Sequence, residues 1–300
     1  MSMQDKNVKK ELLKQALREI HQGVELSKIK EEYREFLQSV SPLEIVLLEQ
    51  ELVSEGVKVE DILKLCDLHV ELFREYIASR ELKNIPRGHP LDLFLRENEW
   101  ILKQAEALSL YARSLLSFRD FKEAEGMLRS LKTVLGELKK IRLHYRKVQM
   151  LLFPYLERRG IIAIPRVLWG REDQVIVKIR EAVAGLERAT SSGSIEGVHE
   201  LGNRLLKLAQ EVADLVFREN KILYPALYEL FTEGEWAAIA EIASDMGWLV
   251  EVGEVEWRPS SKPIYPYELT AAVTREQMEK LPKEFREATE KHGLQPDTYS

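Results

Sequence analysis

Helical periodicity extends over almost the whole chain, and it limits the possible folds more than any other feature. Between residues 5 and 246, apolar residues recur at steps of three and four, and glycines and prolines stand where helices would stop. Strand-like alternation is nearly absent from this region. The sequence therefore predicts an all-α fold.

The composition is that of a globular protein with real hydrophobic cores. Of the 300 residues, 45% are hydrophobic and 31% are charged, which excludes disorder as the main state. The net charge of −6 and the absence of a basic stripe predict that nucleic acid is not a partner. No apolar run reaches the ~18 residues that span a membrane, and the first residues lack the apolar stretch of a signal peptide. The single cysteine, Cys66, excludes an intrachain disulfide and a cysteine-built zinc module. We therefore expect a cytoplasmic protein with no membrane partner.

Residues 1–80 are predicted to form a small N-terminal helical domain. Four short helices are expected, at residues 6–21, 26–38, 42–54 and 59–77. The third has a clear start, because Ser41 can act as N-cap, Pro42 suits the first helical position, and Glu44 can complete a capping box. Residues 81–90 contain two prolines and a glycine and are predicted to be a linker.

A second domain is predicted over residues 91–246. Four long helices are expected at residues 91–118, 121–153, 166–188 and 196–224, with a shorter one near 235–246. Long helices joined by short loops favour an antiparallel four-helix bundle. Residues 247–300 form a C-terminal extension, in which 250–257 alternates like a short strand or hairpin, 258–266 is loop-like, and a last helix runs from 274 to about 291.

The bundle contains an internal repeat. Residues 144–156 match residues 215–227 after a shift of 71, with two aliphatic residues, an aromatic residue, a proline and a leucine in common. The simplest interpretation is two helical hairpins in tandem. The second helix of each hairpin is predicted to end at its Leu-aromatic-Pro sequence, since proline removes a backbone hydrogen bond.

Each of the four long helices has one polar residue within its apolar stripe. These residues are Asn98, His144, Glu172 and Glu219. A buried carboxylate is so costly alone that it is normally paired, protonated or bound to a metal. Two glutamates and a histidine on facing helices could form a carboxylate-rich metal site. A hydrogen-bonded polar layer, with His144 between the two glutamates, explains the same pattern, and both interpretations remain open.

At these residues the sequence resembles the hemerythrin-like HHE cation-binding family, whose repeat places a histidine and glutamates before Leu-Phe-Pro. The resemblance covers residues 86–235. Residues 65–73 and 88–90 look like parts of a domain of unknown function that commonly precedes an HHE domain. A PAS sensor domain often follows in such proteins. Residues 254–259 and 274–291 look like the lead-in to one, but we expect no PAS domain within these 300 residues.

The resemblance also implies a set of metal ligands, which this chain keeps only in part. It implies histidines at positions 98, 144, 172 and 215 and glutamates at 148 and 219. The residues found there are Asn98, His144, Glu172, Leu215, Val148 and Glu219. A di-iron centre with several imidazole ligands is therefore not expected. The remaining set, His144, Glu172 and Glu219 with Asn98 as a weak fourth ligand, would suit a single Fe, Mn or Zn ion or no metal.

Three further residues are candidates for a site between the domains. Cys66 and His69 lie one turn apart on an apolar helix face, and such a pair is half a metal site at most, so a core position is favoured. His89 lies between Gly88 and Pro90 at a helix start, where it either organises the linker or has a role at the domain junction. Cys66, His69 and His89 could meet only if the two domains dock.

No phosphate-binding loop, nucleophile elbow or cysteine nucleophile motif occurs in the sequence. The leading hypothesis is therefore a non-catalytic regulatory, sensor or ligand-binding protein with a degenerate metal site. The first alternative is a mono- or dinuclear metal-binding protein with oxygen or redox-related activity. The second is a structural adaptor that binds a partner through its N-terminal helices or its tail. The partner is expected to be a protein or small ligand, and a homo-oligomer fits as well.

Overall fold

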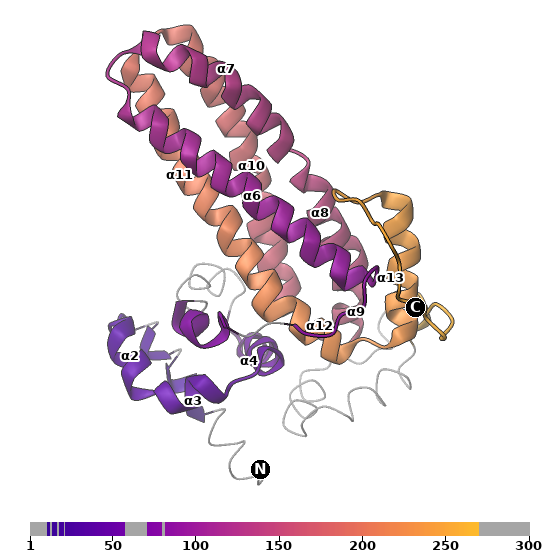
Figure 1. The fold of residues 1–300 in the computed structure, drawn as a ribbon. Helices are drawn as coiled ribbons and strands as arrows, with labels where there is room; N and C mark the ends of the chain where they lie inside the picture. Colours follow the sequence, from indigo (N-terminus) through magenta and orange to yellow (C-terminus); the bar gives the residue numbers. More distant parts are fainter. Residues whose placement is uncertain are drawn as a thin grey trace.

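The chain forms a long helical bundle with a smaller helical unit packed against one end (Figure 1). The computed structural model describes residues 11–57 apart from 13, 17 and 21, residues 71–79, and residues 82–269. Every regular element within these residues is a helix, which confirms the predicted all-α fold. Among them, no helix has the length and apolar character needed to cross a membrane.

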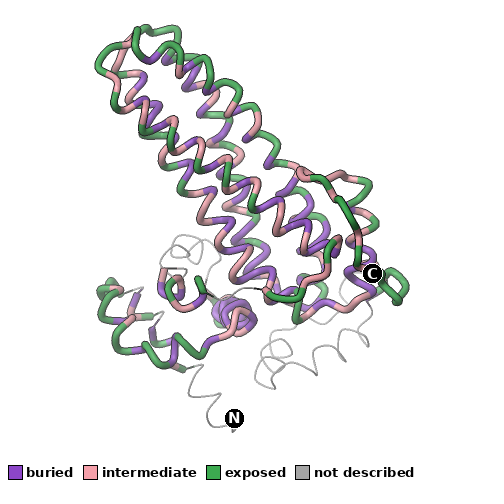
Figure 2. Tube along the Cα trace, viewed as in Figure 1, coloured by how far each residue is buried: buried purple, intermediate pink, exposed green. Residues whose placement is uncertain are grey.

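Four helical rods build the bundle, and their apolar faces point inward (Figure 2). The first is α6 (Pro90–Ser117), and the third is α10 (Ala163–Ser192). The second rod consists of α7 (Phe121–Leu138), α8 (Ile141–Lys147), the π-helix η1 (Val148–Leu152) and α9 (Phe153–Arg158). The fourth consists of α11 (Ile195–Arg218), the π-helix η2 (Glu219–Leu223) and α12 (Tyr224–Leu230). A further helix, α13 (Glu233–Met246), packs against α6 and α8.

The second and fourth rods continue past their prolines, so the predicted helix ends at 153 and 224 are wrong. Pro154 and Pro225 each stand in the first turn of a new α-helix that directly follows a π turn. In the π turns, the amide of Phe153 donates to the Val148 carbonyl, and the amide of Tyr224 donates to the Glu219 carbonyl. In each π turn the backbone hydrogen bond spans five residues instead of the four of an α-helix. This bond, made by the residue just before the proline, compensates for the N–H that the proline lacks.

The N-terminal unit contains α2 (Leu26–Glu32), α3 (Arg34–Ser39) and α4 (Pro42–Ser54), and residues 71–77 are also helical. The predicted capping box is present, since the Glu44 amide donates to Ser41 Oγ at 3.1 Å and the Ser41 amide donates to Glu44 Oε2 at 2.6 Å. The helix predicted at 26–38 is broken at Tyr33, whose backbone leaves the helical region. No glycine or proline marks that break. Most of the helix predicted at 59–77 lies outside the described residues.

Helix α4 joins the two units, because it packs against α10, η2 and α12. It is apolar around most of its circumference, as expected for a helix covered on several sides. The side chain of Gln50 accepts the Ile162 amide at 2.7 Å and the Ala163 amide at 2.9 Å, so it caps the start of α10 from the other unit. Arg74 adds an ion pair to Asp214 of α11 at 2.7 Å.

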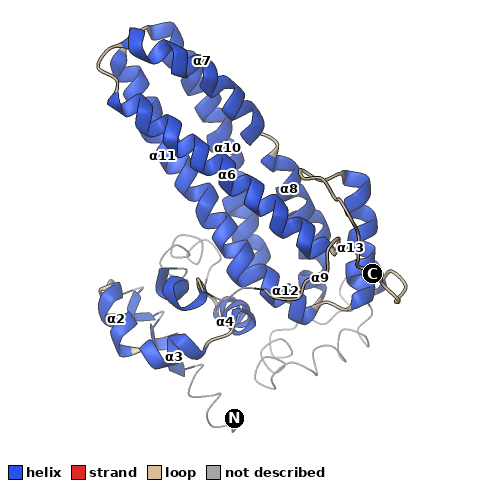
Figure 3. Ribbon diagram, viewed as in Figure 1, coloured by secondary structure: helices blue, strands red, loops and turns tan. Residues whose placement is uncertain are grey.

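Residues 247–269, which we call the C-terminal strap, follow α13 and lie along the bundle without forming a strand (Figure 3). The strand or hairpin predicted at 250–257 is therefore wrong. The amides of Glu256 and Trp257 instead donate to one carbonyl, that of Arg87, each at 3.0 Å. Gly88 has a φ of +77°, and a Cβ there would lie 2.7 Å from Val255, so this close approach requires glycine. The helix predicted at 274–291 lies outside the described residues.

Candidate functional site

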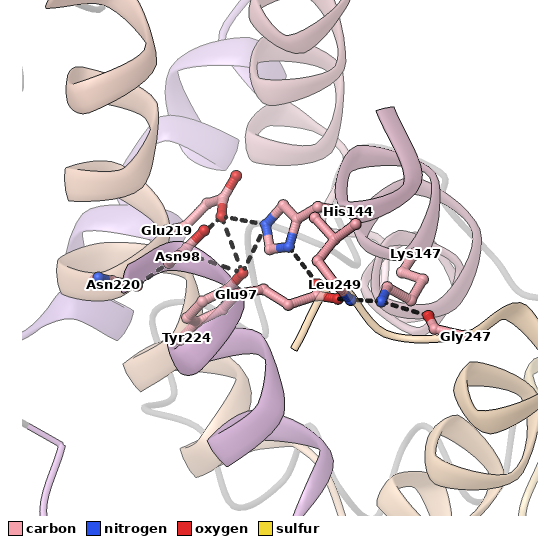
Figure 4. A network of polar contacts seen from close by, with 9 residues as sticks. All are labelled: Glu97, Asn98, His144, Lys147, Glu219, Asn220, Tyr224, Gly247 and Leu249. Atoms are coloured by element: carbon pink, nitrogen blue, oxygen red, sulfur yellow. Dashed lines mark hydrogen bonds and ion pairs between the residues drawn. The ribbon is translucent and has the colours of Figure 1, made fainter. Parts of the chain in front are cut away.

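A fully buried polar layer crosses the bundle at the level of α8 and η2. Figure 4 shows that its side chains come from α6, α8, η2 and α12, with backbone groups added by the C-terminal strap. Glu97, Asn98, His144, Lys147 and Glu172 are each 0% exposed, and Glu219 is 1% exposed. Burial on this scale means that each charge must be balanced by neighbouring groups rather than by water.

His144 lies between two carboxylates. Its Nδ1 is 2.7 Å from Glu97 Oε2, and its Nε2 is 2.9 Å from Glu219 Oε2. Burial alone would lower the pKa of His144, but the charges and hydrogen bonds of Glu219 and Glu97 raise it to about 9. At neutral pH the ring is therefore an imidazolium that donates from both nitrogens.

Glu97 is shared between His144 and a second cation. Its Oε1 pairs with the Lys147 ammonium and accepts the Leu249 amide at 2.7 Å. Burial would raise the pKa of Glu97, but His144 and Lys147 hold it below its ordinary value. Lys147 also donates to the Gly247 carbonyl at 2.8 Å and lies 4.0 Å from the centre of the Trp248 ring. The ammonium is thus buried between a carboxylate, a backbone carbonyl and an aromatic ring.

Glu219 collects three donors on a single oxygen. Its Oε2 accepts from Asn98 at 2.8 Å, from the Tyr224 hydroxyl at 2.9 Å and from His144 at 2.9 Å. The π turn that begins at Glu219 places the carboxylate and Tyr224, five residues later, against each other. The other oxygen, Oε1, is buried and has no hydrogen-bond partner.

Glu172 is buried in the same region but is not hydrogen-bonded to His144 or Glu219. Gln149 donates to its Oε2 at 2.7 Å, and its Oε1 has no partner. Burial, together with the negative charge of Glu219, raises the pKa of Glu172 well above its ordinary value, which favours the neutral acid. Asn98 Oδ1 and the Tyr145 hydroxyl are also buried without partners. Several oxygens of this layer therefore remain uncommitted.

The layer as arranged does not fit a metal held by imidazole. A ligating histidine needs a free lone pair, whereas both nitrogens of His144 donate to carboxylates. In the described part of the chain, no three side chains of His, Cys, Asp or Glu are grouped so that they could hold a metal ion. The donor set that remains for a cation consists of oxygens.

The fold and this layer define a class of protein: antiparallel four-helix bundles that carry a polar site between facing helices near one end. Residues 89–227 match the hemerythrin HHE cation binding domain, and residues 13–79 match a family of unknown function, DUF438. The chain therefore combines a DUF438 domain with a hemerythrin HHE domain, which confirms the resemblance found in the sequence. None of the curated proteins compared with the chain matches it.

The structure brings three of the four predicted metal residues, Asn98, His144 and Glu219, into direct contact. The metal site itself stays a prediction. His89 lies apart from the layer as the N-cap of α6, where its Nδ1 accepts the Leu91 amide at 3.0 Å. Its ring packs against Trp236 and Trp257, and burial lowers its pKa to about 4. Cys66 and His69 lie outside the described residues, so a site shared with His89 also stays a prediction.

Sequence reasoning missed the roles of Glu97 and Lys147. A signal was present, since Glu97 lies three residues after Phe94 and four before Ile101, and Lys147 lies three after His144 and four before Leu151. Both residues therefore share the buried face of their helices. Charged residues at such positions are readily taken for solvent-facing ones, because a helix usually turns them outward.

Proposed function

We propose that this chain is a regulatory or sensor protein of hemerythrin type in which the metal centre is degenerate, and that it catalyses no reaction. The observation that carries the proposal is the charge balance of the buried layer. The carboxylates of Glu97 and Glu219 are matched by two cationic side chains, His144 and Lys147. A divalent ion would supply the same two positive charges.

Charge balance by side chains removes the main driving force for metal binding. A metal entering this layer would have to displace a proton from His144 and separate it from at least one carboxylate. It would also leave the Lys147 ammonium near a second positive charge. Both changes cost free energy, so the layer favours the metal-free state.

A regulatory role is supported by the way the two units meet. Helix α4 of the N-terminal unit packs directly against η2, the turn that begins with Glu219. A displacement of Glu219 is thereby transmitted to α4 of the N-terminal unit. The signal is proposed to be a small ligand or a protein partner, and the proposed location is the cytoplasm, in line with the single cysteine of the chain.

Elemental analysis of the full chain purified without chelator tests this proposal. We expect less than about a tenth of an equivalent of Fe, Mn or Zn, and no rise in melting temperature when any of these ions is added, because a ligand that binds only the folded state must stabilise it. About one bound equivalent that raises the melting temperature would overturn the proposal.

The uncommitted oxygens favour a second candidate, a protein that binds one hard cation. They belong to Asn98, Tyr145, Glu172 and Glu219. Oxygen ligands of this kind suit Mn²⁺ or Fe²⁺ better than softer ions. If elemental analysis finds metal, Glu172→Gln should lower the bound amount, whereas His69→Ala should leave it unchanged. An unchanged metal content in Glu172→Gln would exclude this oxygen site.

A further inference from the structure

The first residues of the C-terminal strap are attached to the buried layer itself. The Leu249 amide donates to Glu97 Oε1 at 2.7 Å, and the Gly247 carbonyl accepts from Lys147 at 2.8 Å. Between them, the Trp248 ring contacts the Lys147 ammonium and lies edge-on to Phe94, with ring centres 5.3 Å apart. Residues 247–249 of the strap are thus held by the Glu97–Lys147 ion pair and by Phe94 of α6.

The same ion pair is part of the core network. While Glu97 Oε1 holds Lys147 and the strap, its Oε2 is 2.7 Å from His144 Nδ1, and the other nitrogen of His144 contacts Glu219. Figure 4 shows this continuous path from Glu219 to Gly247. A single carboxylate therefore joins the centre of the bundle to a segment at its surface.

We propose that residues 247–250 of the strap are the output element of the buried layer: the Glu97–Lys147 ion pair holds them on the bundle, and a change in the charge of the layer releases them. This inference rests on the proposed regulatory function and names its moving part. Because coupling between two sites is reciprocal, lifting the strap must in turn disturb the layer.

The rest of the strap has its own anchors, which confine the release to its first residues. The Tyr155 hydroxyl donates to the Ile264 carbonyl at 2.7 Å, and the Ile264 amide donates to the Gly234 carbonyl at 2.9 Å. Closer to the layer, Arg96 holds the Val252 carbonyl at 3.0 Å. Residues beyond 255 therefore stay docked when the ion pair is lost, and they serve as an internal reference.

Glu97→Gln in the full chain tests the proposal most directly. The amide keeps the shape of the side chain but cannot pair with Lys147, which is left as a buried cation that must move toward water. We expect hydrogen exchange of the backbone amides at 247–250 to become faster by about tenfold or more, with little change at 255–264. Lys147→Met is the second variant, because it removes the charge and the bond to Gly247 while filling the same apolar space.

Leu205→Ala is the matched control. Leu205 is fully buried in α11 at a distance from the strap along the bundle, so its truncation destabilises the core without touching the ion pair. Faster exchange at 247–250 in Glu97→Gln or Lys147→Met, beyond that in Leu205→Ala, supports the proposal. Equal exchange in the variants and the control overturns it. Metal content measured on the same samples bears only on the proposed function, so the two proposals can fail separately.

The reverse direction gives an independent test. The Trp248 ring lies 4.0 Å from the Lys147 ammonium and edge-on to Phe94, so Trp248→Ala weakens the attachment of the first strap residues without altering any charge. We expect this variant to shift the side-chain nitrogen resonances of His144. Unchanged His144 resonances, together with faster exchange along the strap, would show that the strap and the layer are not coupled.

Discussion

His144 is held as a cation between two carboxylates, because, against the effect of burial, Glu219 and Glu97 raise its pKa to about 9. In His144 the two ring nitrogens face Glu97 and Glu219, and no lone pair is left over. The same residue type at the same place would be a ligand if one of those carboxylates were turned away. The chemistry of this position is therefore decided by its neighbours, and Glu97 is the neighbour that decides it.

The His144 cation predicts a loss of stability at alkaline pH. Burial lowers its pKa, but Glu219 and Glu97 raise it to about 9 in the folded chain. An unfolded histidine titrates near pH ~6.5, so the stabilisation is complete below that pH and disappears as the pH rises through about 9. The difference is on the order of 3 kcal/mol. Urea unfolding, followed by the helical circular dichroism from about pH 6 to about pH 10, measures it.

His144→Gln is the control for this pH dependence. Its side chain does not titrate, so the free energy of unfolding should change less between about pH 6.5 and about pH 9 than in the original chain. Since burial and Glu219 raise the pKa of Glu172, and the positive charge of His144 also lowers it, both proteins are compared in a Glu172→Gln background, so that residue 172 titrates in neither. Equal slopes in the two proteins would mean that folding does not raise the pKa of His144.

At the scale of the helices, the most extensive contact between described helices is that of α6 with α11, the first and fourth rods. Gly202 of α11 makes this approach possible. A Cβ at Gly202 would lie 3.0 Å from Leu116 Cγ and 3.1 Å from the Ala112 carbonyl, both on α6. The position of Glu219 on the same rod depends on this contact, since a displaced α11 would carry η2 with it.

Gly202→Ala should therefore destabilise the chain even though alanine is the better helix former. The added methyl overpacks the α6–α11 contact, and we expect a loss of about 1–3 kcal/mol in the free energy of unfolding. Gly136 of α7 is the matched control, because a Cβ there meets no atom within 4 Å. Gly136→Ala should stabilise the helix by about 0.5–1 kcal/mol. Denaturant unfolding of both variants tests this, and changes of the same sign would refute the packing argument.

The helices also show how far the sequence predicts the fold. Helix starts were predictable at Ser41 and Pro90, because capping groups act within one turn. The buried stripes were predictable as well, since they depend on spacing alone. The ends at Pro154 and Pro225 were not, because a π turn compensates for proline through a backbone bond that leaves no mark in the sequence. The contacts of Glu97 with Lys147 and Leu249 depend on how α8 and the strap pack, which no local pattern reveals.

At the scale of the whole molecule, the N-terminal unit docks at the end of the bundle that holds the polar layer (Figure 1). The docking includes a cap that crosses between the units, since Gln50 of α4 accepts the amides of Ile162, the N-cap residue of α10, and of Ala163, its first residue. Because α10 carries Glu172, the N-terminal unit also fixes, through Gln50, a helix that contributes to the layer.

Gln50→Ala should weaken the attachment of the two units. Two amides at the start of α10 lose their acceptor in a buried place, and we expect a loss of about 1–2 kcal/mol. Gln50→Glu keeps the accepting oxygen and places a negative charge at a helix N-terminus, so it should lose less. Calorimetric melting of both variants is the measurement. An equal loss in the two would show that the cap contributes nothing beyond packing.

The two π turns also record the order of events in the history of the bundle. A π turn holds one residue more than the α-helical turn it replaces, so each marks a single-residue insertion. The insertions stand at 148–152 and 219–223, at the same offset of 71 residues that relates the two hairpins. The simplest history is that one ancestral hairpin had already gained the extra residue when its gene segment was duplicated. The copies later diverged at the first position of the turn, where one has Glu219 and the other Val148.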